Sequence, residues 1–290
     1  MKKILVPTDF SECAENAVEI AASIAKKMDA RLYILHVMDI PVYDRNDSFQ
    51  SYTDTSEGLF WIKLVKKRFK ELFQKPFLNG VNAVEVLQFD GVYDTITNQA
   101  EEHGIDLIVM GSHGDSGAHE VFIGSNTEKV VRLADCPVLT VKKRHENFKL
   151  DNVVFASNFY GEAKENFERL FNFIKAFDAH IHLVKIITPD HFESTSYTET
   201  LINSFADDWK LKNFTTHIVN ERTIHDGIHE SAKRVNADMI AMETHGRTGF
   251  ARFLYGSQTE SVVNHAEIPV LSIKIKEIKK DFSPFSHLTK

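Results

Sequence analysis

A short segment rich in glycine is the first feature of this sequence that could do chemistry. Gly111-Ser-His-Gly114 follows the apolar run 107–110, and Gly124-Ser125 comes after nine further residues. Because glycine has no Cβ atom, a phosphate can approach the backbone closely and the chain can turn with a positive φ. We expect Ser125 to start a helix, with Glu128 as its capping-box partner, and the N–H groups at such a start attract anions. The spacing therefore predicts a cradle for a phosphate or a ribose.

The segment occurs twice in the chain. Residues 105–142 align without a gap with residues 237–274, and residues 3–25 match residues 152–174. The period of this repeat is about 140 residues. Solenoid repeats have periods of about 20–50 residues, so the repeat is a duplicated domain. We expect a first domain with the intact motif, a second domain with a degenerate motif, and a polar tail. Their bounds are 1–145, 150–276 and 277–290.

Strands and helices that could position the glycine segment are expected to alternate along each copy. Short apolar runs such as Ile4–Pro7 and residues 106–110 predict buried strands, and helices with one apolar face are expected between them. Ser11 is expected to cap the first of these helices. Strands that are apolar on both faces and alternate with helices predict a parallel sheet covered by helices. Ligands of such sheets bind at the carboxyl ends of the strands, where the strand order reverses.

Three motifs together resemble the universal stress protein family. They are VPTDFS at residues 6–11, the glycine pattern, and CPVLTV at residues 136–141. The likeness extends over both copies to about residue 275, so the chain is identified as a tandem, two-domain member. The resemblance implies an α/β fold of two Rossmann-like domains of the adenine nucleotide alpha hydrolase-like type, each with a five-stranded parallel sheet and helices on both faces.

The resemblance also implies how the two copies assemble. The last strand of each domain, at residues 137–141 and 269–273, is expected to pair with the other across an interface. In a tandem chain this pairing makes an intrachain pseudo-dimer in which the edge strands protect one another. Whether two chains form a further homodimer is left open.

Nucleotide-binding members of the family imply the residues of the site. The first-strand Asp would lie at the base or ribose, a second-strand residue would contact adenine through its backbone, and the glycines and following Ser would hold the ribose and phosphates. Carried over, these residues are Pro7, Thr8, Asp9, Val37, Met110, Gly111, His113, Gly114, Gly124, Ser125 and Asn126. The expected ligand is ATP or another adenine nucleotide. Because Asp115 stands where many nucleotide-binding relatives carry a basic residue, a role for Mg²⁺ is left open.

The second copy keeps only part of this pattern. Asp9 aligns with Asn158, and Gly111 aligns with Glu243. A glutamate adds bulk and negative charge where a ribose or phosphate would lie, so we expect this site to be weak or empty for ATP. The residues assigned to the second, weaker site are Gly246, Arg247, Gly256 and Ser257.

No catalytic residue and no metal ligand is predicted. The sequence has no Walker loop, no nucleophile elbow and no convincing general base beside the glycine segment, so ATP hydrolysis would be weak at most. His225 and His229 have the spacing of a chelating pair on one helix face, although two polar surface residues are the alternative interpretation. Cys136 aligns with the apolar Ile268, which predicts a buried, inert thiol.

Composition narrows the class of partner. The chain has 290 residues, 43% of them hydrophobic and 26% charged, with a formal net charge of -7. An acidic surface repels nucleic-acid phosphates, and no apolar run approaches the roughly 20 residues that span a bilayer. Two cysteines form no disulfide framework, which fits a reducing compartment. We therefore expect a cytoplasmic location without a nucleic-acid or membrane partner.

The leading hypothesis is a cytoplasmic stress-response protein that binds ATP or another adenine nucleotide in its first domain. It would act as a regulator or sensor rather than as a robust enzyme. Two alternatives belong to other classes. One is a nucleotide-independent scaffold that keeps the glycines for packing, and the other is a slow ATPase.

Overall fold

The computed structural model describes residues 1–38, 55–89, 91–112, 124–145, 148–160, 163–245 and 261–275. The first half contains β1 (Lys3–Pro7), α1 (Glu12–Met28), β2 (Arg31–Met38), α3 (Ser56–Phe73), a 3-10 turn (Pro76–Leu78), β3 (Ala83–Phe89), α4 (Val92–Glu102), β4 (Leu107–Gly111), α5 (Ser125–Leu133) and β5 (Val138–Val141). The second half contains β6 (Asn152–Ala156), α6 (Ala163–Phe177), β7 (His180–Ile187), α7 (Thr195–Asp208), β8 (Phe214–Asn220), α8 (Ile224–Arg234), β9 (Met239–His245) and β10 (Val270–Ile275). The expected polar tail, 277–290, lies outside the described residues.

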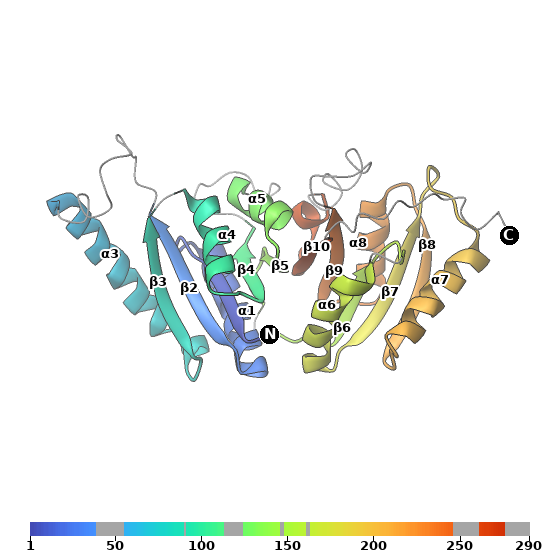
Figure 1. Ribbon diagram of the computed structural model, residues 1–290, viewed down its shortest axis with the longest axis horizontal. Helices are drawn as coiled ribbons and strands as arrows, with labels where there is room; N and C mark the ends of the chain where they lie inside the picture. Colours follow the sequence, from blue (N-terminus) through green and yellow to red (C-terminus); the bar gives the residue numbers. More distant parts are fainter. Residues whose placement is uncertain are drawn as a thin grey trace.

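The described strands form one ten-stranded sheet in the order β3-β2-β1-β4-β5-β10-β9-β6-β7-β8 (Figure 1). Within each half the five strands pair in parallel, which confirms the predicted architecture. The strand order reverses between β1 and β4 in the first half and between β6 and β9 in the second. These two places are where a parallel sheet offers a ligand crevice.

Helices cover both faces of the sheet. The core on one face runs through both halves and includes side chains of α1, α3, α6 and α7. On the other face, α4 and α5 cover the first half, and α8 with the helical residues 261–265 covers the second. Ile4 and Val6 of β1 belong to the first core and Leu5 to the second, so the strand is buried on both sides as parallel sheets require.

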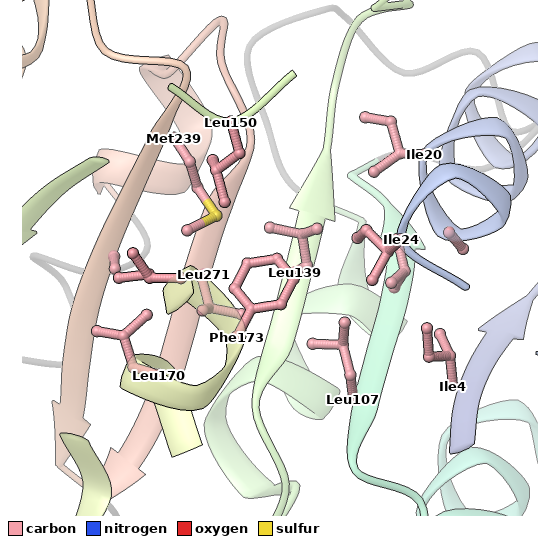
Figure 2. Packing of buried hydrophobic residues seen from close by; sticks show 14 of the residues in the cluster. Ile4, Ile20, Ile24, Leu107, Leu139, Leu150, Leu170, Phe173, Met239 and Leu271 are labelled. Atoms are coloured by element: carbon pink, nitrogen blue, oxygen red, sulfur yellow. The ribbon is translucent and has the colours of Figure 1, made fainter. Parts of the chain in front are cut away.

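The two halves join through β5 and β10, which pair antiparallel. The central pair of this joint is Leu139 with Leu271, two residues that the internal repeat aligns with each other. Both leucines are fully buried and lie with Phe173 of α6 in the core that the halves share (Figure 2). The expected intrachain pseudo-dimer is therefore present, and its interface is isologous.

A lysine on each side of the joint between β5 and β10 contacts the other half, and the two contacts are similar. Lys142 donates through Nζ to the carbonyl of Asn264, at a distance of 2.9 Å. Lys274, which the repeat aligns with Lys142, donates to the carbonyl of Leu133 at 3.1 Å and pairs with Asp135 at 3.0 Å. Each ammonium group thus meets the carboxyl end of a helix in the other half, where the helix dipole favours a positive charge.

Helix starts test the capping predictions. Ser11 caps α1 as expected, since its side chain accepts from the N–H of Ala14 at 3.2 Å. The capping box at Ser125 was wrong, because the cap residue of α5 is Gly124 and Ser125 is the first helical residue. The backbone N–H of Glu128 bonds instead to the Gly124 carbonyl at 2.9 Å.

No helix in the described ranges has the length and apolar character to cross a bilayer.

Candidate functional site

The residues assigned to the first site converge at the carboxyl ends of β1, β2 and β4. Pro7 ends β1 and is followed by Thr8 and Asp9, while Met110 and Gly111 end β4. The remaining described members are Val37 near the end of β2, Gly124 at the cap of α5, and Ser125 and Asn126 in its first turn. His113 and Gly114 lie outside the described residues. Segments far apart in the sequence therefore meet at the point where the strand order reverses.

The turn after β1 fixes the position of Asp9. The N–H of Thr8 donates to the Leu35 carbonyl at 2.7 Å, and the N–H of Phe10 donates to Thr8 Oγ1 at 3.0 Å. Asp9 Oδ1 accepts from the N–H of Ser11 at 3.0 Å, and Phe10 has a left-handed φ of 64°. This turn leaves Asp9 exposed at the rim of the site.

The start of α5 offers an anion site. Thr127 Oγ1 donates to the Gly111 carbonyl at 2.9 Å, and the N–H of Gly124 donates to the Ser112 carbonyl at 2.7 Å. These bonds attach the helix start to the end of β4. Gly124 has no side chain to cap the helix, and among the described residues no side chain makes the cap hydrogen bond, so the first-turn N–H groups can bind an anion. This geometry fits a phosphate.

Gly111 also has a packing role. A Cβ atom placed on it would lie 2.9 Å from Cys13 Sγ and 3.1 Å from the Cys13 backbone. The close approach of α1 to β4 therefore requires a residue without a side chain at this position. The glycine is explained by helix–strand contact whether or not a ligand binds beside it.

We predict that Gly111→Ala lowers the free energy of unfolding by about 1–3 kcal/mol, as overpacking of a dense core does. Urea denaturation would measure it. Gly91→Ala is the matched control, because its Cβ atom would meet Asp94 Oδ2 at an ordinary 3.5 Å. Equal stability of the two variants would contradict the packing argument.

His36 belongs to this site, and the sequence analysis did not single it out. Its Nδ1 donates to the Thr8 carbonyl at 2.7 Å, and its ring lies 4.8 Å from the ring of Phe10. Burial lowers the pKa of His36, and the hydrogen bond to Thr8 and the charge of Asp9 offset this only in part. The imidazole is therefore neutral at pH 7 and adds no positive charge to the site.

Comparison with known proteins identifies the family of this chain. The sequence profile described as the universal stress protein family matches residues 1–142 and again residues 149–274. The chain belongs to the universal stress protein family. A universal stress protein of Methanocaldococcus jannaschii is 36% identical over 150 residues, which cover 49% of this chain and 82% of the relative. One from Bacillus subtilis is 32% identical over 153 residues, which cover 48% of this chain and 98% of the relative.

A solved structure of another universal stress protein has the same fold over nearly the whole chain. The crystal structure of a universal stress protein from Archaeoglobus fulgidus superposes with a TM-score of 0.70 at 21% identity. It covers 94% of this chain, and the match spans 98% of that protein. The predicted tandem arrangement of Rossmann-like domains is therefore confirmed.

The second domain of this universal stress protein repeats the turn geometry of the first. The N–H of Phe159 donates to Ser157 Oγ at 2.9 Å, and the N–H of Tyr160 donates to Asn158 Oδ1 at 3.0 Å. Phe159 has a φ of 60°, close to that of its counterpart Phe10. A hydroxyl residue followed by Asp or Asn is therefore enough to build the turn, and the Thr-Asp pair of the first copy has a structural explanation too.

A buried ion pair distinguishes the second domain from the first. Lys185 takes the position of His36, and its ammonium group donates to Glu193 Oε2 at 2.8 Å and to the Asn158 carbonyl at 2.9 Å. Burial alone would raise the pKa of Glu193, but hydrogen bonds from Lys185 and Tyr160 outweigh it and hold this pKa below its ordinary value. A lone lysine in the apolar strand His180–Ile187 was the sequence signal that could have revealed this network.

Glu243 takes the position of Gly111 at the end of the second site. Its side chain is buried, with the residue 8% exposed, and Oε2 accepts from Ser157 Oγ at 3.4 Å. The four residues assigned to the weaker site, Gly246, Arg247, Gly256 and Ser257, lie outside the described residues. The assignment of both sites thus stays a prediction.

Histidines gather on and beside α8 in the described part of the second domain. His225 and His229 share one face of α8, with ring centroids 4.6 Å apart, and His265 lies 4.9 Å from His225. Across the described ranges, no group of three or more His, Cys, Asp or Glu side chains is placed to hold a metal ion. Cys136 is buried as predicted.

Proposed function

We propose that the first domain binds ATP or another adenine nucleotide and that the protein acts as a regulator or sensor in a stress response. The observation that supports this most directly is the start of α5, which hydrogen bonds attach to the end of β4 beside the strand-order reversal. Phosphates bind at such helix starts. Membership of the universal stress protein family makes an adenine nucleotide the first candidate.

Nucleotide occupancy would act by favouring one conformation or one set of partners. No general base is found among the described residues beside α5, so we propose binding without robust catalysis. Whether Mg²⁺ accompanies the nucleotide is left open, because Asp115 stands where many nucleotide-binding relatives carry a basic residue. A cytoplasmic location without a nucleic-acid or membrane partner belongs to the same proposal.

The nucleotide-independent scaffold remains the second candidate because Gly111 is required by its contact with Cys13. Under this hypothesis the glycines of the motif serve packing alone. A slow ATPase is the third. Phosphate release that persists through purification and disappears in Gly114→Val would favour it.

The deciding experiment measures nucleotide carried through gentle purification. The protein is denatured and the released small molecules are separated by chromatography. We expect about one adenine nucleotide per chain. Two per chain would show that the second domain also binds nucleotide, and none, together with no ATP binding by calorimetry, would favour the scaffold.

A matched pair of variants locates the bound nucleotide. Asp9→Ala and Asn158→Ala each remove the side chain that forms the turn at aligned positions of the two domains. We expect Asp9→Ala to weaken ATP binding about tenfold or more, as the loss of a charged hydrogen-bond partner does. Asn158→Ala should leave it unchanged. Equal losses would place the nucleotide elsewhere.

A further inference from the structure

Three histidines gather at the edge of the sheet in the second half, near the amino ends of its last two strands. His180 and His182 lie in β7, and His217 lies in β8, the last strand in the sheet order. Their ring nitrogens surround one hydroxyl group. Thr215 Oγ1 lies 2.7 Å from His182 Nδ1 and 3.2 Å from His217 Nε2. The same oxygen lies 3.3 Å from His180 Nε2, so the three rings share one hydrogen-bond network.

The outer nitrogens of two rings fix where their protons lie. His180 Nδ1 faces Asn213 Oδ1 at 2.6 Å, and His182 Nε2 faces Asn152 Oδ1 at 3.3 Å. An amide oxygen only accepts hydrogen bonds, so each of these ring nitrogens carries an N–H. In the neutral rings the inner nitrogens, which face Thr215, then have lone pairs. A proton added to either ring must therefore enter the inside of the cluster.

A proton taken up inside the cluster brings positive charges together. The ring centroid of His182 lies 4.7 Å from that of His180 and 5.3 Å from that of His217. His182 is only 8% exposed, so water screens its charge poorly. Burial, followed by the charges of His180 and His217, lowers the pKa of His182 to about 4. The closed cluster therefore binds protons weakly.

The helix packed beside the cluster adds to the repulsion. Lys233 and Arg234 lie in the last turn of α8. Burial is the main cause that lowers the pKa of His217, and the positive charges of Arg234 and His180 lower it further. Arg234 meets Glu230 only at 3.9 Å, and both side chains are more than half exposed, so this carboxylate does little to offset its charge.

The carboxylates on the other side of the cluster belong to the starts of β6 and β9. Asp238 Oδ2 accepts from the backbone N–H groups of Asp151 and Asn152, at 2.8 Å in both cases. Asp151 itself is exposed. Among the described residues, the main charges that act on His182 are those of the other histidines. Protonation of the cluster thus has no close anion to balance it there.

The corresponding edge of the first half is built without histidine. The aligned positions carry Arg31, Tyr33, Val84 and Val86. In other respects β3 and β8 are alike, because they are the two edge strands of the sheet (Figure 1) and each has seven residues, none of them fully buried. Edge strands with so little burial open at low cost. The first half therefore contains a matched control for the second.

We propose that His180, His182 and His217 form an acid-sensitive latch, which holds β8 against β7 at neutral pH and releases this edge of the sheet when the cluster takes up protons. The ligand of the latch is the proton. A fall in pH would loosen the second half while the first half, which carries the candidate nucleotide site, keeps its fold. The latch needs no nucleotide.

The direction of the effect follows from the pKa of His182. This pKa is about 4 in the closed cluster and 6.5 in an exposed histidine, so the open form binds more protons between these two values. The latch is therefore strongest above pH 6.5 and weakens as the pH falls toward 4. For this one group, the equilibrium between closed and open forms shifts about 30-fold from pH 7.5 to pH 5.

Backbone hydrogen exchange of the full chain without nucleotide, followed by mass spectrometry, tests the latch. The rates are corrected for the intrinsic effect of pH on exchange. We expect the protection of β8 to fall about 30-fold between pH 7.5 and pH 5, and that of β3 to fall less than about threefold. Equal losses in the two edge strands would overturn the proposal, as would a β8 whose protection does not change.

His182→Gln tests whether the histidines cause the response. Glutamine can hydrogen-bond to Thr215 but does not titrate, so the loss of β8 protection in acid should shrink at least about threefold. The control is His191→Gln, which removes an exposed histidine beyond the carboxyl end of β7 and should keep the full response.

His217→Val is the second test, in case His182→Gln already loosens β8 at pH 7.5. It introduces the residue that Val86 supplies at the aligned position of β3, and it removes one of the charges that repel His182. We expect the acid response of β8 to shrink in this variant too. A response that survives intact in both variants would refute the latch.

Discussion

Replacing Lys185 by methionine is expected to lower the free energy of unfolding by about 3 kcal/mol. The side chain of Lys185 is 4% exposed and that of Glu193 is 18% exposed, so the variant leaves a largely buried carboxylate without its cation. Breaking one side of a buried pair costs about 3–5 kcal/mol, and the lower end applies because Tyr160 and Thr198 still donate to Glu193. Urea denaturation of the full chain measures the loss.

The double variant Lys185→Met/Glu193→Gln should recover a large part of the loss, because it removes the stranded charge along with its partner. Lys143→Met is the matched control. Lys143 pairs with Glu267 at 2.7 Å, but both side chains are mostly exposed, and exposed pairs contribute little. If Lys185→Met were no more harmful than Lys143→Met, the ion pair would have no structural role.

Leu139→Ala is expected to lower the free energy of unfolding by about 2–5 kcal/mol, as other deletions of a buried leucine do. Leu139 is fully buried at the joint between the two halves, opposite Leu271 and in the core shared with α6. Because the cavity would border both halves, both should lose stability together. A comparable loss is expected for Leu271→Ala.

The two tryptophans of the chain can follow the two halves separately. Trp61 lies in α3 of the first half and Trp209 follows α7 in the second. In Trp61→Phe and Trp209→Phe backgrounds, Leu139→Ala should shift both fluorescence transitions. A shift confined to Trp61 would show that the halves unfold independently. Leu59→Ala, at a side chain that is 47% exposed, is the control and should have a small effect.

The sequence predicted the architecture because its signals were repeated and local. Apolar runs between amphipathic helices marked the strands, and the duplication showed that each half had to make the same sheet. The predicted cap of α5 was wrong for a physical reason. Gly124 is the cap residue but has no side chain to make a cap hydrogen bond, so the sequence does not distinguish it from Ser125, the first helical residue.

The place in the fold where the described candidate residues meet was predictable from the sequence, but their contacts were less so. Pro7, Asp9 and Gly111 meet at the strand-order reversal because the fold brings strand ends together there. His36 and Glu193 could not be found in this way. His36 acts through its contact with the Thr8 carbonyl, and Glu193 reaches Lys185 from a connection whose path depends on tertiary packing.

The pairing of Leu139 with its own counterpart Leu271 has a consequence for how the two sites can change over time. In a dimer of separate chains, one gene encodes both subunits, and every substitution appears in both sites at once. Dilution also dissociates such a dimer. Here the linkage within one chain keeps the effective concentration of the partner high at any dilution. One half can therefore acquire Lys185 and Glu243 while the other keeps His36 and Gly111, and the assembly always contains one of each.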